Sequence, residues 1–331
     1  MTDDSTRECA SRDACPKIDN DARQCVRLSA VSAPASIPDI LDVHLLHGEH
    51  ARPGAPPDLI VEVPHGATTT ADFTSLAAQL ESPLPASLID FFYVNTDAGA
   101  PELALAVARR FTAAAPARTA AVLRCRVPRT FIDCNRRIDA SPAEFREGKV
   151  TPGIPPWITA AADRALLRER YDAYVGAVRA AIDLRAPGGA LLLLHSYAPR
   201  SVDVEVDQDI VQKLRHAWQP DVAPTWPLRP EVDIIGRDVD GTSHAPEAVV
   251  SALREALAAR GIAAGDSATY PLHPSTLAWD HARRLPGRAL CIEVRRDLLA
   301  DPFDPFAEMR IGPDRVERLA EPLAAALQAW W

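Results

Sequence analysis

The chain has 331 residues, of which 47% are hydrophobic and 24% are charged, and its net charge is −9 at pH 7. This length and composition allow a sizeable core, in one large α/β domain or in two smaller ones. The acidic balance argues against a nucleic acid or an anionic membrane as partner, although a local arginine cluster could still bind an anionic small molecule.

Residues 1–35 are polar and charged and show no hydrophobic periodicity, so we predict a flexible leader there and a single domain over 36–331. The N-terminus lacks the apolar segment of a secretory signal. No stretch of the sequence approaches the roughly 18 apolar residues of a membrane span. We therefore expect no membrane partner and a cytoplasmic location.

The cysteines do not form a disulfide pattern. Three lie in the leader at spacings that match no common zinc signature: Cys9, Cys15 and Cys25. The other three lie in apolar runs and are expected to be buried free thiols: Cys125, Cys134 and Cys291. Free thiols are typical of a reducing compartment, which again favours the cytoplasm.

Short apolar runs alternate with helical patterns along the domain. We predict strands at 43–46, 59–63, 119–126, 190–196, 231–237 and 289–294, and a strand or buried loop at 87–95. We predict helices at 68–80, 97–111, 158–184, 207–218, 246–260 and 315–331, and a long loop at 139–158 that could act as a lid. This alternation indicates a three-layer α/β fold, with a mostly parallel or mixed central sheet and helices on both faces.

Two histidines stand at the ends of apolar strands. His65 follows LIVEVP, and His195 follows ALLLL. Each alone could be a turn or core histidine, but ligands gather at the carboxyl ends of strands in open α/β sheets, so the matching placement favours a metal site. Catalytic zinc takes three protein ligands and leaves a fourth position for water.

The third ligand must come from elsewhere in the chain. Glu62 lies three residues before His65 in the strand, so its side chain should point to the opposite face of the sheet. Asp90 and Asp97 are better placed. Asp97 could instead be only the N-cap of the following helix.

An arginine-rich run follows the third predicted strand and contains Arg126, Arg129, Arg136 and Arg137. Paired N–H donors of one or two of these arginines could bind a substrate carboxylate. Alternatively, they could pair with Asp133 or Asp139 and hold the loop in place.

Glu293 lies between Ile292 and Val294 in a predicted central strand. A carboxylate in such a place is costly unless it is paired or functional. It could pair with Arg295 on the same face of the strand, or it could act as a general base beside a metal-bound water.

The chain resembles the N-formylglutamate amidohydrolase family. The resemblance rests on five segments in the family's order: PHGA with His65, DAGAPELA with Asp97, PRTFIDCNR with Arg129, Asp133, Asn135 and Arg136, LHS with His195, and CIEVRRDLL with Glu293. Together they span about residues 59–299, and the R-x-x-x-D-x-N-R run is the most specific. The resemblance implies a zinc-carboxypeptidase-like (phosphorylase/hydrolase-like) α/β catalytic domain.

The resemblance also implies a function: zinc-dependent hydrolysis of the amide in a small, carboxylate-bearing N-acyl amino acid such as N-formylglutamate. It assigns the metal to His65, Asp97 and His195. It assigns substrate binding to Arg129, Asn135 and Arg136, with Arg129 also polarising the scissile carbonyl. Glu293 would take a proton from the metal-bound water and pass it to the leaving amine.

The same residues fit other functions. Carboxylate-binding arginines would also serve a zinc carboxypeptidase or deacylase that acts on short peptides or on another N-acyl compound. A non-catalytic binding protein could retain the fold. Histidine and aspartate ligands also suit other divalent metals, namely iron, manganese or nickel.

Overall fold

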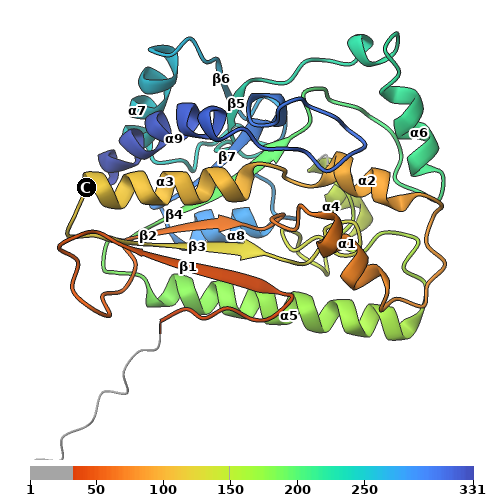
Figure 1. Ribbon diagram of the computed structural model, residues 1–331, viewed down its shortest axis with the longest axis horizontal. Coiled ribbons are helices and arrows are strands. Elements are labelled where there is room, and N and C mark those ends of the chain that lie inside the picture. The colour runs from red at the N-terminus through yellow and green to blue at the C-terminus, as the bar shows by residue number, and fades with distance from the viewer. Residues whose placement is uncertain (1–32, 149) are drawn as a thin grey trace, which may run out of the picture. The chain divides into compact units, whose positions relative to one another are not determined.

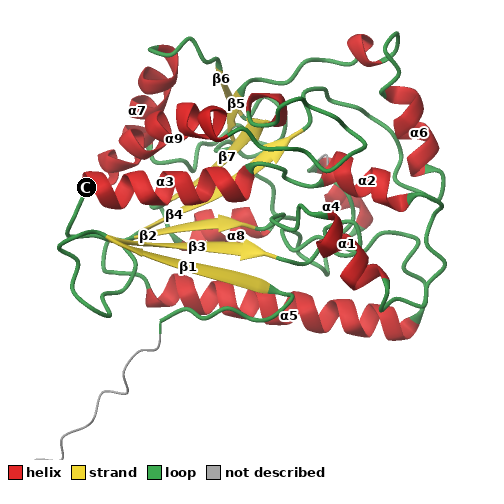
Figure 2. Ribbon diagram, in the orientation of Figure 1, coloured by secondary structure: helices red, strands yellow, loops and turns green. Residues whose placement is uncertain are grey.

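The computed structural model describes residues 33–148 and 150–331, in which a seven-stranded sheet separates two layers of helices (Figures 1 and 2). The predicted leader, with its three cysteines, lies almost entirely outside the described residues. The other three cysteines, Cys125, Cys134 and Cys291, are buried free thiols, as predicted. No helix within the described part of the chain is long and apolar enough to cross a membrane.

The sheet is mixed, and its centre is parallel. Its strands are β1 (Leu41–His47), β2 (Leu59–Val63), β3 (Thr119–Cys125), β4 (Ala190–Tyr197), β5 (Val232–Ile234), β6 (Ala264–Asp266) and β7 (Ala289–Arg295). The strand order is β1-β3-β2-β4-β7-β5-β6. Strands β3, β2, β4 and β7 run parallel, whereas β1 and β5 are antiparallel to their neighbours β3 and β7. The four parallel strands therefore present their carboxyl ends at one edge, where ligands bind in such sheets.

The helices cover both faces of this sheet. They are α1 (Thr70–Ala77), α2 (Leu88–Asn95), α3 (Ala100–Ala114), α4 (Pro142–Glu147), α5 (Ala161–Leu184), α6 (Ile210–Ala217), α7 (Glu247–Ala258), α8 (Leu277–Arg284) and α9 (Pro313–Leu327). Helices α3, α7 and α9 share one apolar core with the sheet, and α5 and α8 share the other. In Figure 1, α3 and α9 lie above the sheet and α5 lies below it. The predicted three-layer α/β fold is confirmed.

The central strands are apolar on both sides because both sides are covered. All five residues of β2 are buried: Leu59 and Val61 pack in the core of α3, whereas Ile60 packs in the core of α5. Helix α3 buries Leu103 and Val107, one turn apart, together with Phe111 in the following turn. Burial on both faces is why these strands read as continuous apolar runs.

The prediction of a strand or buried loop at 87–95 is wrong. The segment forms α2, which buries Leu88, Phe91 and Phe92, a helical spacing. A short apolar run fits a strand and a buried helix equally well, and the tertiary contacts decide between them. The predicted loop at 139–158 also contains a helix, α4, which begins with a capping box between Ser141 and Glu144. Helix α8 and strand β6 were not predicted.

Candidate active site

Two neighbouring parallel strands bring His65 and His195 together. His65 lies two residues beyond β2, and His195 lies in β4, which pairs with β2. Asp97 comes from the connection between α2 and α3. One ligand atom from each of these three residues lies within 4.8 Å of the other two, and all three side chains are buried. The structure thus brings together the three residues predicted to bind the metal.

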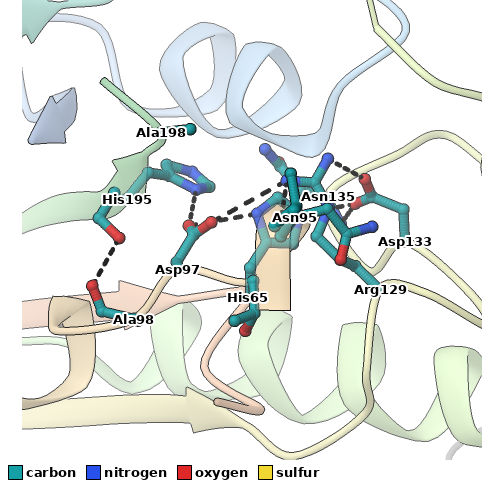
Figure 3. A network of polar contacts seen from close by, with 12 residues as sticks. His65, Asn95, Asp97, Ala98, Arg129, Asp133, Asn135, His195 and Ala198 are labelled. Atoms are coloured by element: carbon teal, nitrogen blue, oxygen red, sulfur yellow. Dashed lines mark hydrogen bonds and ion pairs between the residues drawn. The ribbon is translucent and has the colours of Figure 1, made fainter. Parts of the chain in front are cut away.

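The carboxylate of Asp97 lies between the two histidines (Figure 3). Its Oδ2 atom is 2.9 Å from Nδ1 of His195 and 3.3 Å from Nδ1 of His65. The alternative role as a helix cap is wrong, because the N-cap of α3 is Gly99 and the helix has no side-chain cap. The other candidate, Asp90, pairs instead with Arg215 at 2.7 Å.

Asp133 completes the surroundings of His65, and sequence reasoning missed this role. Its Oδ1 atom lies 2.8 Å from Nε2 of His65. This contact orients the ring and leaves Nδ1 directed toward Asp97. A metal-binding histidine usually donates its second N–H to a carboxylate or carbonyl. This rule could have assigned Asp133 to His65 from the sequence. Asp133 lies in the arginine-rich run, and it was considered only as a partner of the arginines.

The charges around this site keep both aspartates ionised. Burial alone would raise the pKa of Asp97, but His65 and His195 outweigh it and lower that pKa below the ordinary value. Burial likewise opposes ionisation of Asp133, but Arg136, His65 and Arg129 hold its pKa well below the usual range. Both carboxylates are therefore negatively charged at neutral pH.

The donor set fits a divalent metal. Two imidazole nitrogens and one carboxylate oxygen are a common ligand set of catalytic zinc. In addition, Nε2 of His195 and Oε2 of Glu293 are buried and have no hydrogen-bond partner among the described residues. In folded proteins, buried polar atoms rarely lack a hydrogen-bond partner. These observations support a ligand-binding centre at this point of the sheet.

Glu293 lies beside the cluster. It stands directly opposite His195 in the ladder between β4 and β7. The alternative pairing with Arg295 is not formed, since Arg295 pairs with Asp297 at 2.8 Å. Burial raises the pKa of Glu293 to about 7, and although His195 opposes this rise, the negative charge of Asp97 adds to it. Such a group can both accept and donate a proton near neutral pH.

The arginine-rich run divides into two pairs. Arg129 and Arg136 face the site, where they lie 3.0 and 3.3 Å from Oδ2 of Asp133. Arg126 instead pairs with Asp42 and Asp72, and Arg137 donates to the carbonyl of Pro274. Arg129 and Arg136 therefore lie at the site, and they also form the predicted ion pairs with Asp133. The predicted pairing with Asp139 is not formed, because Asp139 lies near Arg168.

Asn135 is held by its neighbours. Its backbone N–H donates to Asp133, and its side-chain oxygen accepts from the backbone N–H of Ala278 at 3.2 Å. Its side-chain NH₂ group donates to no residue in the described part of the chain. Asn135 lines the same cavity as Arg129 and Arg136, so these three residues can offer several N–H donors to one anion.

The cavity that contains the site has a volume of about 1040 Å³. His65, His195 and Glu293 line it together with the two arginines and Asn135. Sequence reasoning missed three further residues of its wall: Arg229, Tyr270 and Arg296. Arg229 donates to the hydroxyl of Tyr270 at 2.8 Å. Arg229 and Tyr270 come from connections that only the tertiary fold brings to the site, whereas Arg296 lies in the CIEVRRDLL segment but was assigned no role there.

Glu62 lies on the opposite face of the sheet, as strand geometry predicts. It is buried and accepts a hydrogen bond of 2.8 Å from the hydroxyl of Tyr174 in α5. His281 of α8 lies 3.5 Å from it. Glu62 is therefore part of the core beneath the sheet and not of the cluster around His65.

Comparisons with known proteins agree with this geometry. The family model of N-formylglutamate amidohydrolase matches residues 58–300. A crystal structure of N-formylglutamate amidohydrolase from Ralstonia eutropha JMP134 aligns with a TM-score of 0.55 at 18% identity, over 88% of this chain and 97% of that one. A gene product from Agrobacterium tumefaciens aligns with a TM-score of 0.51 at 18% identity, over 91% and 96% of the two chains.

Two other comparisons add no support. A metallo-carboxypeptidase from Burkholderia cenocepacia aligns with a TM-score of 0.35 at 14% identity, over 87% of this chain and 60% of that one, which is too low for an inference. No curated protein matches the sequence significantly. The family match covers most of the chain and contains every residue of the site. The chain therefore belongs to the N-formylglutamate amidohydrolase family, a family of hydrolases.

Proposed function

We propose that this protein is a metal-dependent amidohydrolase that cleaves the amide of a small, carboxylate-bearing N-acyl amino acid, of which N-formylglutamate is the example named by the family. The observation that carries the proposal is the buried cluster of His65, Asp97 and His195 in a cavity that also contains Glu293 and two arginines. The family match supports the reaction type, and the ligand set supports the metal.

In this proposal His65, Asp97 and His195 hold the metal, with zinc the best match and iron, manganese or nickel also compatible. When bound, such an ion would polarise the scissile carbonyl and lower the pKa of a water molecule. The chain contributes the orientation of the ligands. Asp133 accepts the Nε2–H of His65 and so fixes the ring in the tautomer whose Nδ1 is free to bind.

Glu293 is the proposed general base. It takes one proton from the attacking water, and the remaining hydroxide oxygen forms a bond to the carbonyl carbon. When the C–N bond breaks, Glu293 returns the proton to the leaving nitrogen, so that the products are a carboxylic acid and a free amino acid. A pKa near 7 suits both transfers.

Arg129, Asn135 and Arg136 are the proposed substrate-binding residues. Arg129 is held by Asp133 and by the carbonyl of Asn95, with Nη1 at 3.9 Å from Asp97, so it lies next to the cluster. This position suits the stabilisation of the oxyanion that develops on the carbonyl. Asn135 and Arg136, which line the cavity, are the proposed binding site of the substrate carboxylate.

The test compares His195→Ala with His50→Ala, which makes the same change at an exposed histidine. Metal content is measured by elemental analysis, and amine release is measured with N-formyl, N-acetyl and peptide substrates. We expect His195→Ala to lose both metal and turnover, while His50→Ala keeps both. Full turnover in metal-free His195→Ala protein would overturn the proposal. Preferential cleavage of peptides would identify a carboxypeptidase instead.

A further inference from the structure

The cavity is larger than the proposed reaction requires. Its volume is about 1040 Å³. At a water's share of about 30 Å³ for each of its roughly twelve non-hydrogen atoms, N-formylglutamate would fill only about a third of this space. The remaining volume has room for a larger substrate, and the side chains that line it indicate the chemistry of that substrate.

One side of the cavity is an apolar wall, which we define as Val202, Val204, Val206, Ile210, Leu214 and Trp218. The three valines alternate with Asp203 and Glu205 in the extended segment after β4. The valines are partly buried and pack against the core, whereas the two acidic residues are exposed. Successive side chains of an extended segment point to opposite sides, so the three valines share one side. Asp203 and Glu205 also line the cavity, but they are exposed to solvent, and the valines supply its apolar surface in this segment.

Helix α6 completes the apolar wall. Its residues Ile210 and Leu214, one turn apart, are buried and also line the cavity. Helix α6 packs against α2, whose residue Phe91 lines the same cavity (Figure 1). Core packing accounts for the buried side chains. The valines and Trp218 pack against the core with only part of their surface, and they also line the cavity.

Trp218 adds an aromatic ring to this wall. Its side chain is partly buried, packs against the core and lines the cavity. Ligand pockets are lined mainly by apolar and aromatic side chains. The apolar wall thus has the composition of a ligand-binding surface.

The proposed positions of the carboxylate and the amide leave the acyl group for the rest of the cavity. A substrate whose carboxylate contacts Arg136 and whose amide lies at His65 extends its acyl group away from Arg136. The apolar wall belongs to the connection after β4 and to α6 and lines the same cavity, so it is the apolar surface available to that group.

We propose that the apolar wall binds the acyl group of the substrate, so that the enzyme prefers amino acids with long aliphatic or aromatic acyl groups to N-formyl ones. This proposal rests on the proposed amidohydrolase function and specifies its substrate class. Water adds to the amide carbon as described, and the products are a long-chain or aromatic carboxylic acid and a free amino acid.

The first test varies only the acyl group. The specificity constant kcat/KM of the metal-loaded protein is measured with the N-formyl, N-acetyl, N-hexanoyl and N-phenylacetyl derivatives of one amino acid, glutamate. We expect kcat/KM to rise about fourfold for each methylene that becomes buried, until the wall is covered. A steady fall from the formyl to the hexanoyl derivative would overturn the proposal.

The second test changes the apolar wall itself. Val204→Asp places a charge among the valines and should lower the ratio of hexanoyl to acetyl activity at least tenfold. The matched control is Val239→Asp, because Val239 is 48% exposed and lies outside the cavity. Val204→Thr keeps the shape of the side chain and should lower the same ratio less, and thermal melting shows whether each variant is folded. An unchanged ratio in folded Val204→Asp protein would contradict the proposal.

A binding experiment separates the failure of this proposal from the failure of the proposed function. If no N-acyl amino acid is hydrolysed, the amidohydrolase function is wrong, and the affinities of the protein for N-hexanoyl- and N-acetylglutamate are compared by calorimetry. Tighter binding of the hexanoyl compound, abolished by Val204→Asp but not by Val239→Asp, would support the apolar wall as an acyl site. Equal binding of the two compounds would refute it.

Discussion

Asp133 is not one of the proposed metal ligands, yet it contacts His65 and orients the ring of this ligand. Its two carboxylate oxygens are divided between two tasks. Oδ1 accepts a hydrogen bond from Nε2 of His65, and Oδ2 forms ion pairs with Arg129 and Arg136. One aspartate therefore couples the metal-binding half of the site to the substrate-binding half.

We expect Asp133→Asn to weaken metal binding by about 10- to 100-fold, because an amide in place of the carboxylate no longer accepts the N–H of His65 in the same way. The dissociation constant is measured by titration of metal-free protein with zinc. Asp139→Asn is the control, since the side chain of Asp139 is 81% exposed. Equal affinities of the two variants would show that His65 is oriented by other contacts.

The raised pKa of Glu293 has a consequence for stability. The pKa of an ordinary glutamate is 4.5, whereas the pKa of Glu293 in the folded protein is about 7. Between these values the folded state retains a proton that the unfolded state has lost, so the metal-free protein loses stability as pH rises through this window. At about 1.36 kcal/mol per pKa unit, the full effect is on the order of 3 kcal/mol.

Glu293→Gln removes this ionisation. In metal-free protein we expect the variant to be more stable than the wild type above pH 7, and equally stable near pH 4. Urea unfolding at a series of pH values measures the difference. A difference that stayed constant with pH would mean that Glu293 titrates normally.

At the scale of elements, the carboxyl end of α2 determines where Asp97 lies. Arg296 donates to the carbonyls of Tyr93 and Val94 at 3.0 and 2.6 Å, and Arg129 donates to the carbonyl of Asn95. These bonds satisfy the last carbonyls of the helix with positive charges, which the helix dipole favours. The chain reaches Asp97 two residues later. Burial lowers the pKa of Arg296 to about 10, so this arginine is still charged at neutral pH.

Arg296→Met should destabilise the protein by about 2–4 kcal/mol, because two buried carbonyls lose charged donors. It should also weaken metal binding, since the connection that carries Asp97 is no longer held. Urea unfolding and zinc titration measure the two effects. The same change at Arg310, whose side chain is 79% exposed, serves as the control. If Arg296→Met protein unfolds at the same urea concentration as the wild type, the cost of burying the guanidinium equals the gain from its hydrogen bonds.

Some of the strands and helices could be predicted from the sequence, and others could not. The strand at 59–63 was predicted at its observed bounds, and the other central strands were predicted within one residue, because buried parallel strands are continuous apolar runs with clear ends. Helix α2 was missed, because an apolar run of eight residues carries no distinct period. Asp97 could not be separated from a helix cap until the structure placed Gly99 in that role.

At the scale of the whole molecule, the order of strands could not be predicted. That order places β4 between β2 and β7, although they are far apart in the sequence, and so it alone brings His195 between His65 and Glu293. The family resemblance predicted the same set of residues. Asp133 and Arg296 also lie in segments that carry the resemblance, but their contacts with His65 and with the end of α2 depend on long-range packing that the sequence does not show.

Removal of the metal should lower the stability of the whole domain, because its proposed ligands join β2, β4 and the connection before α3. A ligand that binds only the folded state stabilises it by about 2.7 kcal/mol at a concentration of 100 times its Kd. We therefore expect a chelator to lower the melting temperature by several degrees. His195→Ala protein should show no such shift, and an equal shift in this variant would place the metal elsewhere.

The position of β4 in the sheet also has a consequence for synthesis of the protein. Strands β2 and β4 pair directly, so the proposed metal ligands can meet once the chain has been made as far as Tyr197. The proposed base arrives only when β7 adds to the other side of β4, nearly 100 residues later. Chains grow and fold from the N-terminus. A growing chain would thus have its three proposed metal ligands before it had the proposed base.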